Sequence, residues 1–267
     1  MIRRPAVAGT FYPGNAAELR RMLDQFMTSS APSVPAIGVV SPHAGYIYSG
    51  RVAGAVLSRV NVTDTVIVLA PAHRQATAPF GLWTEGEWIT PMGSVPTDES
   101  LSRQLLNEVA DLGEDYIAHV AEHSGEVQIP FLQYRNPQVK IVSIVVATHD
   151  LSLLKRFGAD MAKVLQGLTP RPLIVASSDM THYEPEQAAR RKDNLAIQEM
   201  LGLDPDALWT KVVSTPISMC GMAPVVSMLT CANQLGAGKA ELVLYETSAR
   251  ASGDFSQVVG YAGIVVT

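Results

Sequence analysis

The sequence has little cysteine and lacks a long hydrophobic run. Its two cysteines are Cys220 and Cys231, and if both lie on or beside one helix their separation spans roughly 16 Å, too far for a disulfide. No apolar run approaches the length that crosses a bilayer, and Pro5, Gly9 and Pro13 interrupt the region where a signal peptide would carry its apolar helix. These absences predict a cytoplasmic protein with reduced thiols and no membrane association.

The sequence also lacks a Lys/Arg cluster and a glycine-rich phosphate-binding motif. The net charge is -5, which disfavours a nucleic-acid surface because such surfaces neutralise phosphates with basic side chains. No motif for nucleotide binding is present, so we expect no nucleotide cofactor. A small-molecule substrate is the expected partner, with a peptide or protein as the alternative.

Hydrophobic residues make up 47% of the 267 residues, enough for one large buried sheet, and no linker divides the chain. We therefore expect a single domain over 1–267. Short β-branched runs alternate with helical patterns, which is typical of an α/β fold with a mixed, largely parallel central sheet and helices on both faces. Strands are expected at 36–40, 65–70, 140–146, 173–176, 241–245 and 258–266, and helices at 15–27, 50–60, 98–109, 152–165, 186–200 and from about 224, with a loop over 29–35.

Histidines follow four of the expected strands. They are His43, His73, His149 and His182. The loops that leave the carboxyl ends of parallel strands form the ligand crevice of such sheets, so several of these side chains are expected to converge. His43 and His73 each follow a proline that stiffens the strand exit, and as a pair on consecutive strands they indicate metal ligands more strongly than either does alone. We interpret His149 and His119 as structural or surface residues.

Three further motifs each allow two interpretations. Asp179 and His182 lie at one strand exit, where the carboxylate could orient the imidazole for acid/base chemistry or could only close a turn on its own backbone. Glu122 and Glu126 flank His123 and could orient a ligand, or could be solvated charges at a helix start. Cys220 precedes an expected helix, whose N-terminus would stabilise a thiolate, although a buried inert cysteine is more common.

Taken together, the motifs closely resemble those of the Memo family, also called AmmeMemoRadiSam system protein B. They occur in order along nearly the whole chain: Pro5–Pro13, Pro42–Gly50, Glu122–Ser124, Pro130–Leu132, Ser177–Asp179, His182–Tyr183, Cys220–Gly221 and Val259–Ala262. The fold of that family resembles that of class III extradiol dioxygenases, in which two histidines and a carboxylate hold non-haem iron(II) and a further histidine is the acid/base.

The resemblance implies a role for each matching residue. His43 and His73 take the positions of the histidine ligands, Cys220 that of the third ligand and His182 that of the acid/base, while Asp179 and His123 line the same pocket. A thiolate in place of a carboxylate shifts the metal preference toward softer ions, so copper is the alternative to iron(II). The resulting hypothesis is an iron-dependent oxidoreductase or dioxygenase that acts on a phenolic or other small substrate. Its rival is a non-catalytic module that binds a metal or a peptide in the same cleft.

Overall fold

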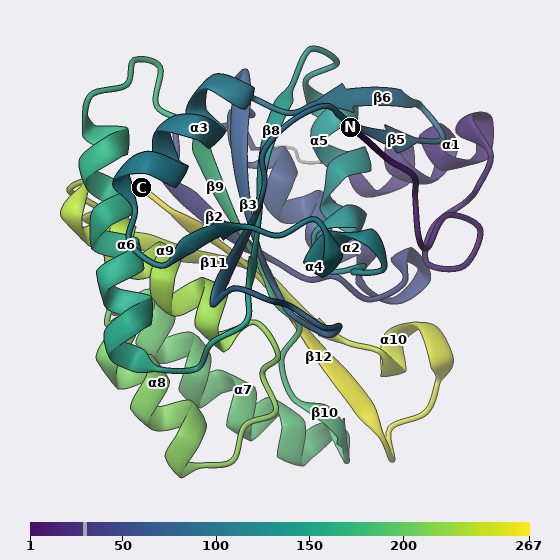
Figure 1. The fold of residues 1–267 in the computed structure, drawn as a ribbon. Helices are drawn as coiled ribbons and strands as arrows, with labels where there is room; N and C mark the ends of the chain where they lie inside the picture. Colours follow the sequence, from purple (N-terminus) through teal and green to yellow (C-terminus); the bar gives the residue numbers. More distant parts are fainter. Residues whose placement is uncertain (29–30) are drawn as a thin grey trace.

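The computed structural model describes residues 1–28 and 31–267, so part of the loop expected over 29–35, namely Ser29 and Ser30, lies outside the described residues. The large sheet has the strand order β10-β12-β2-β9-β3-β8-β4-β7, with β11 paired to β12 (Figure 1). Its centre is parallel and consists of β2 (Gly38–Ser41), β9 (Leu173–Ser177), β3 (Thr65–Pro71) and β8 (Lys140–Val146).

Antiparallel pairs extend this parallel centre on both sides, which accounts for the mixed sheet. On one side β12 (Val258–Val266) pairs with β2, β11 (Ala240–Thr247) and β10 (His182–Glu184). On the other side β4 (Phe80–Trp83) pairs antiparallel with β8 and parallel with β7 (Leu112–Glu114). A separate small sheet joins β1 (Ile2–Arg3), β5 (Glu87–Thr90) and β6 (Gly93–Pro96).

Helices cover both faces of the large sheet, as expected for this fold class (Figure 1). One face carries α3 (Glu99–Glu108), α6 (Leu151–Gln166), α7 (Glu186–Leu201), α8 (Pro205–Ser214) and α9 (Met222–Gln234). The other carries α1 (Ala16–Phe26), α2 (Tyr46–Ser58) and α5 (Ile129–Arg135). The shorter elements are α4 (Ile117–Val120), η1 (Glu126–Gln128) and α10 (Ala249–Ser252).

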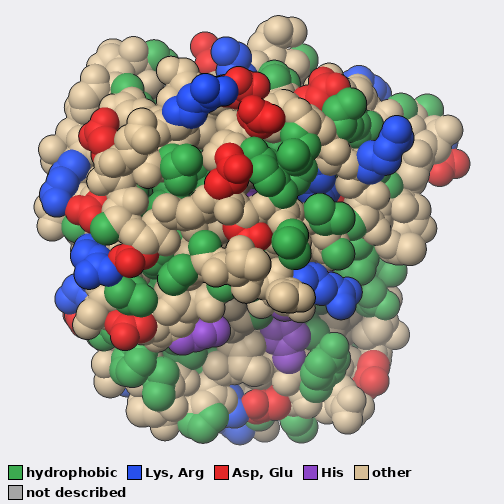
Figure 2. Space-filling model, viewed as in Figure 1, with side chains coloured by type: hydrophobic (Ala, Val, Ile, Leu, Met, Phe, Trp, Pro, Cys, Tyr) green, Lys and Arg blue, Asp and Glu red, His purple; other side chains and the backbone are tan. Residues whose placement is uncertain are grey.

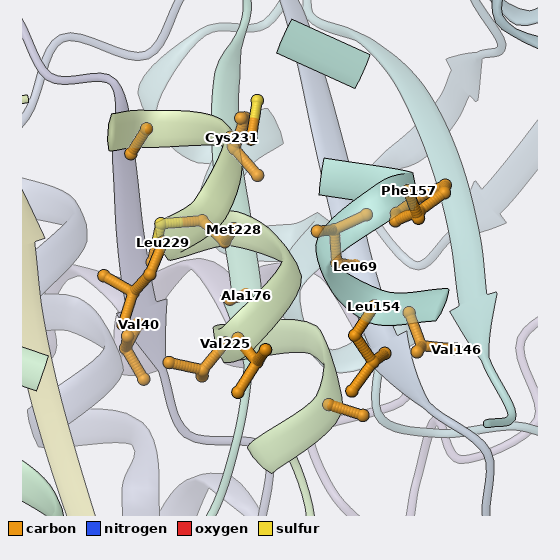
Figure 3. Packing of buried hydrophobic residues seen from close by; sticks show 14 of the residues in the cluster. Val40, Leu69, Val146, Leu154, Phe157, Ala176, Val225, Met228, Leu229 and Cys231 are labelled. Carbon is orange, nitrogen blue, oxygen red and sulfur yellow. The ribbon is translucent and has the colours of Figure 1, made fainter. Parts of the chain in front are cut away.

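Alternation along the strands divides the core into two layers. In β3, Ile67 and Leu69 pack on the α6/α9 face, whereas Val66 and Val68 pack on the α1/α2 face. Successive side chains of a strand point to opposite faces, so a run of β-branched residues fills both layers. Figure 3 shows Val225, Met228 and Leu229 of α9 and Leu154 and Phe157 of α6 facing the strand residues Val40, Leu69, Val146 and Ala176. This packing fixes the central strands on which the site is built.

Local signals explain where several helices begin. The Asn15 side chain accepts hydrogen bonds from the backbone N–H groups of Ala17 and Glu18 and so caps α1, as its sequence predicts. Asp98 and Asp150 cap α3 and α6 in the same way, by accepting from Leu101 N–H and Leu153 N–H. In contrast, α2 begins at Tyr46 and not at Gly50, because Gly45 occupies the cap position without a side-chain cap that the sequence could reveal.

Within residues 1–28 and 31–267, no helix combines the length and the apolar character that crossing a membrane requires. Both cysteines are free, as the sequence predicts.

Candidate metal centre

Three strand exits meet at one edge of the sheet. Ser41 of β2 is in register with Ser177 of β9, and Leu69 of β3 is in register with Ala176 of β9. Because β9 lies between β2 and β3, the loops that carry His43, His73 and Asp179 leave the sheet side by side. The convergence expected from the sequence therefore occurs, and Figure 2 shows histidine atoms reaching the surface in the lower half of that view.

His43 is buried and has a defined tautomer. Its Nδ1 lies 2.8 Å from Ser177 Oγ, which donates its own proton to the Ser124 carbonyl at 2.7 Å and accepts from Gln128 Nε2 at 3.0 Å. Because the Ser177 hydroxyl proton is already donated to the Ser124 carbonyl, the proton between Ser177 Oγ and His43 must come from His43 Nδ1. This leaves a lone pair on His43 Nε2. Burial, together with the nearby His73 and His123, holds the pKa of His43 well below its usual value, so the ring is neutral and suited to metal binding.

His73 and His123 share the carboxylate of Glu122. His73 Nδ1 lies 2.9 Å from Glu122 Oε1 and its backbone N–H donates to Oε2 at 2.6 Å, while His123 Nδ1 lies 3.4 Å from Oε1. Burial raises the pKa of Glu122, but hydrogen bonds from His73 and Ser124 outweigh it and lower that pKa to about 2. Glu122 is 2% exposed, so the solvated-charge interpretation of this segment is wrong. An ionised carboxylate instead orients one imidazole directly and adjoins the other.

His43, His73 and His123 form a group that could hold a metal ion. One ligand atom from each lies within 4.8 Å of the others, and their rings are 4.6–5.5 Å apart between centroids. Cys220 Sγ lies 3.2 Å from His43 Nε2, so the thiol adjoins the same group. The structure therefore brings together His43 and His73, two of the expected ligands, with His123, which the resemblance places only in the pocket lining. Cys220, the expected third ligand, contacts His43 but is not a member of this group of three.

Cys220 reaches this position because a glycine follows it. A Cβ on Gly221 would lie 2.3 Å from the Ser177 carbonyl oxygen and 2.4 Å from Ser178 Cβ, so a side chain there would separate α9 from the exit of β9. The sequence places Cys220 before a helix and predicts a lowered thiol pKa. That prediction is wrong for the metal-free protein: burial, with the nearby Asp179 carboxylate, raises the pKa of Cys220.

Asp179 and His182 complete the site. Asp179 Oδ1 accepts from the His43 N–H at 2.8 Å, so its carboxylate holds the β2 exit and does not close a turn on its own backbone. Burial raises the pKa of Asp179 to about 6. His182 is partly exposed, and its Nδ1 lies 2.9 Å from the Ser218 carbonyl oxygen. A carbonyl can only accept, so Nδ1 carries the proton and Nε2 is free to accept another.

The other histidines have different surroundings. His119 is buried, with Nε2 2.9 Å from the Gly81 carbonyl, and burial lowers its pKa to about 4, as fits a structural residue. His149 is exposed after β8. Sequence reasoning missed a buried ion pair in which Arg3 Nη1 lies 2.7 Å from Glu126 Oε2, and Glu126 Oε1 accepts from Tyr12 Oη at 2.6 Å. The ion pair and this hydrogen bond hold Arg3 and Tyr12 against Glu126, which lies three residues after His123.

The fold and the histidine group together define an α/β protein with a candidate metal centre at the carboxyl ends of its central strands. Comparison with solved structures gives the same architecture. The crystal structure of uncharacterized protein JW3007 from Escherichia coli K12 is similar with a TM-score of 0.58 at 12% identity, covering 85% of this chain and 98% of that chain. The α/β fold expected from the sequence, with a mixed, largely parallel sheet and helices on both faces, is confirmed.

The model of the Memo family, described as Memo-like protein, matches residues 3–265. The chain is 38% identical over 99% of both chains to MEMO1 family protein MK0963 of Methanopyrus kandleri. It is 39% identical to a MEMO1 family protein of Aquifex aeolicus, covering 99% of this chain and 98% of that one. The protein therefore belongs to the Memo family, as the motifs indicate.

Proposed function

We propose that this protein is a non-haem iron-dependent oxidoreductase of the dioxygenase class that acts on a small, phenolic substrate. The observation that carries the proposal is the group of His43, His73 and His123 at one sheet edge, with Cys220 in contact with His43 and with a further histidine, His182, whose Nε2 is free to accept a proton. A site that only binds metal has no use for a free base near the metal, whereas an oxygenase needs one to move substrate protons.

The residues present fit a divalent transition metal. His43 and His73 each have Nδ1 tied to an oxygen, which leaves Nε2 as the ligand atom, and this is the usual arrangement of metal-binding imidazoles. His43 and His73 would hold the ion together with Cys220, and His123 would either complete the set or line the pocket. Imidazole with thiolate suits iron(II) and also copper, which is the alternative metal. Bound iron(II) would supply open positions for a phenolate oxygen and for O2.

The protein's own residues handle protons and orientation. His182 Nε2 would accept the proton of a substrate hydroxyl, because Ser218 holds Nδ1 in its protonated form. Asp179 would keep His43 and the following loop in place through its backbone hydrogen bond. Glu122, ionised at neutral pH, would hold His73. The hydroxyl of Ser177 would fix the His43 ring.

The test begins with elemental analysis of protein purified without chelators, followed by reconstitution with iron(II) or copper under controlled oxygen. Oxygen uptake is then measured over a panel of catechols and monophenols. We expect iron-loaded protein to consume O2 with at least one catechol, and His182→Ala protein with the same metal content to be slower. Stoichiometric metal without oxygen uptake for any panel member would favour the rival, a non-catalytic metal-binding or peptide-binding module.

A further inference from the structure

A cavity adjoins the metal centre. It has a volume of about 330 Å³ and lies between the start of α2, the start of β10 and the loop after α10. Ala44, next to His43, and Tyr183, next to His182, both line it. We call it the tyrosine pocket; its lining residues are Ala44, Tyr48, Tyr183, Ser248, Ser252, Asp254, Gln257, Val259 and Tyr261.

Tyr261 in this pocket is buried without a hydrogen-bond partner. The residue is 1% exposed, and within the described part of the chain its hydroxyl makes no hydrogen bond. Burial raises its pKa, with the Asp179 carboxylate and the hydroxyls of Tyr48 and Tyr183 acting in the same direction, so it stays a neutral phenol. Tyr261 Oη is not among the fully enclosed polar atoms that lack a partner, so the hydroxyl is reached from the pocket that the residue lines. A phenol that opens to a cavity can contact a ligand there.

Tyr183 shows a second sign of a binding role. Its backbone has φ of 58°, in the left-handed region that costs non-glycine residues energy, and the residue is 72% exposed. Strained residues of this kind cluster at ligand sites, and nothing in the core requires an exposed aromatic ring here. Tyr48, 39% exposed, gives the pocket a second accessible ring.

The charge of the pocket is negative. Among the described residues that line it, Asp254 is the only carboxylate and none is a lysine or arginine. Asp254 Oδ1 accepts from Ser256 N–H at 2.8 Å and from Ser256 Oγ at 2.6 Å, and these hydrogen bonds lower the pKa of Asp254, which stays ionised. Aromatic faces beside a carboxylate attract organic cations, because the negative π-face and the carboxylate both favour positive charge.

We propose that the tyrosine pocket binds the ammonium group of a small organic cation. The proposal rests on the proposed function in one respect: the cation would be the end of the substrate that lies away from the metal, with its phenolic end directed past Ala44 toward His43. Recognition in the pocket itself requires neither metal nor turnover, because its lining residues include none of the histidines or Cys220.

The test uses choline and its neutral counterpart 3,3-dimethylbutan-1-ol, which differ in a quaternary nitrogen against a carbon. Binding to the full chain is measured by calorimetry, both with metal and after chelation, so that the result does not depend on oxygen chemistry. We expect choline to bind more tightly than the alcohol by about 3-fold to about 30-fold, the range of cation–π interactions. Equal affinities for the two probes, or no binding of choline, would overturn the proposal and leave the proposed function untouched.

Two variants separate the contribution of the carboxylate charge to choline binding from that of the aromatic ring. Asp254→Asn keeps an oxygen for the Ser256 hydrogen bonds but removes the charge, so it should weaken choline binding and leave the alcohol unaffected. Tyr183→Leu removes an exposed ring and should weaken choline binding without unfolding the protein. Asp206→Asn, on α8 and outside the pocket, is the matched control and should leave both affinities unchanged. Unchanged choline affinity in Asp254→Asn and Tyr183→Leu would assign choline to another surface and overturn the proposal.

Discussion

The Glu122 carboxylate lies 2.9 Å from Nδ1 of His73 and also accepts the backbone N–H of the same residue. Both contacts come from one buried side chain, so the position of the ring and that of its loop are set together. Carboxylates that hold metal-binding histidines in this way increase their basicity and fix the tautomer.

Glu122→Gln should therefore lower metal affinity by about 10-fold to 100-fold, the range for changing such a carboxylate. The amide can no longer accept hydrogen bonds on both sides, so His73 N–H or Nδ1–H loses its partner. Competition with a chelator of known affinity measures the effect. Glu108→Gln, at the exposed end of α3, is the control. Wild-type affinity in Glu122→Gln would show that the carboxylate does not position His73 for metal binding.

The ligand set can be decided by four single variants. His43→Ala and His73→Ala should each abolish stoichiometric metal binding while circular dichroism stays unchanged, because neither side chain belongs to the hydrophobic core. Cys220→Ala should do the same if the thiolate is the third ligand, whereas His123→Ala should then retain metal. If Cys220→Ala instead retains the metal and His123→Ala loses it, His123 is the third ligand.

His182→Ala should keep the metal and lose turnover by roughly 10²-fold to 10⁴-fold, as expected when a general acid/base is removed. The measurement pairs metal content with the rate for a substrate found in the oxygen-uptake panel. His149→Ala, which changes the exposed histidine after β8, should leave both quantities unchanged. Loss of metal in His182→Ala would move His182 into the coordination sphere.

Gly221→Ala should destabilise the protein by about 1–3 kcal/mol, the usual cost of inserting a methyl group into a packed region. The added Cβ would meet the Ser177 carbonyl oxygen at 2.3 Å, so relief of the clash must move Cys220 away from His43. Urea unfolding and metal affinity should both decline. Gly238→Ala, where a Cβ would meet nothing within 4 Å, supplies the matched control.

Asp115 predicts a pH dependence of stability. Burial raises its pKa, but hydrogen bonds from Thr77, Ala118 and Ala78 outweigh it, so the folded pKa lies below the ordinary 3.8. The ionised carboxylate therefore stabilises the fold above about pH 4, and this contribution is lost as the pH falls through the folded pKa. Asp115→Asn should lower the unfolding midpoint at pH 7, and the difference from the wild type should shrink toward pH 3. A pH-independent difference would assign the effect to packing.

Much of the central sheet can be predicted because its strands are continuous β-branched runs buried on both faces. The strands β2, β3, β8 and β9 carry this signal. The segment 80–96 does not, because its strands contain few β-branched residues and belong to two different sheets. The strand order could not be predicted either, because the sequence alone does not place β9 between β2 and β3.

For the site, the histidines at strand exits were identifiable from the sequence, but their partners were not. Ser177 and Gln128 fix the His43 ring through hydrogen bonds between segments that are far apart in the sequence. A local sequence motif cannot reveal such a network. Glu122 looked like a surface charge because burial depends on tertiary packing. The raised pKa of Cys220 has the same origin: a position before a helix favours the thiolate, but burial in the assembled fold outweighs it.

The insertion of β9 between β2 and β3 also orders events during synthesis. His43 and His73 leave the ribosome early, but their strands are not held in one sheet until residues 173–177 pair with both of them. Cys220 emerges later still. A nascent chain therefore exposes two separate imidazoles, and the assembled ligand group is available only to a chain that has been translated beyond β9 and, for the thiol, beyond Cys220. Tight metal binding should therefore indicate that the chain has assembled the central sheet.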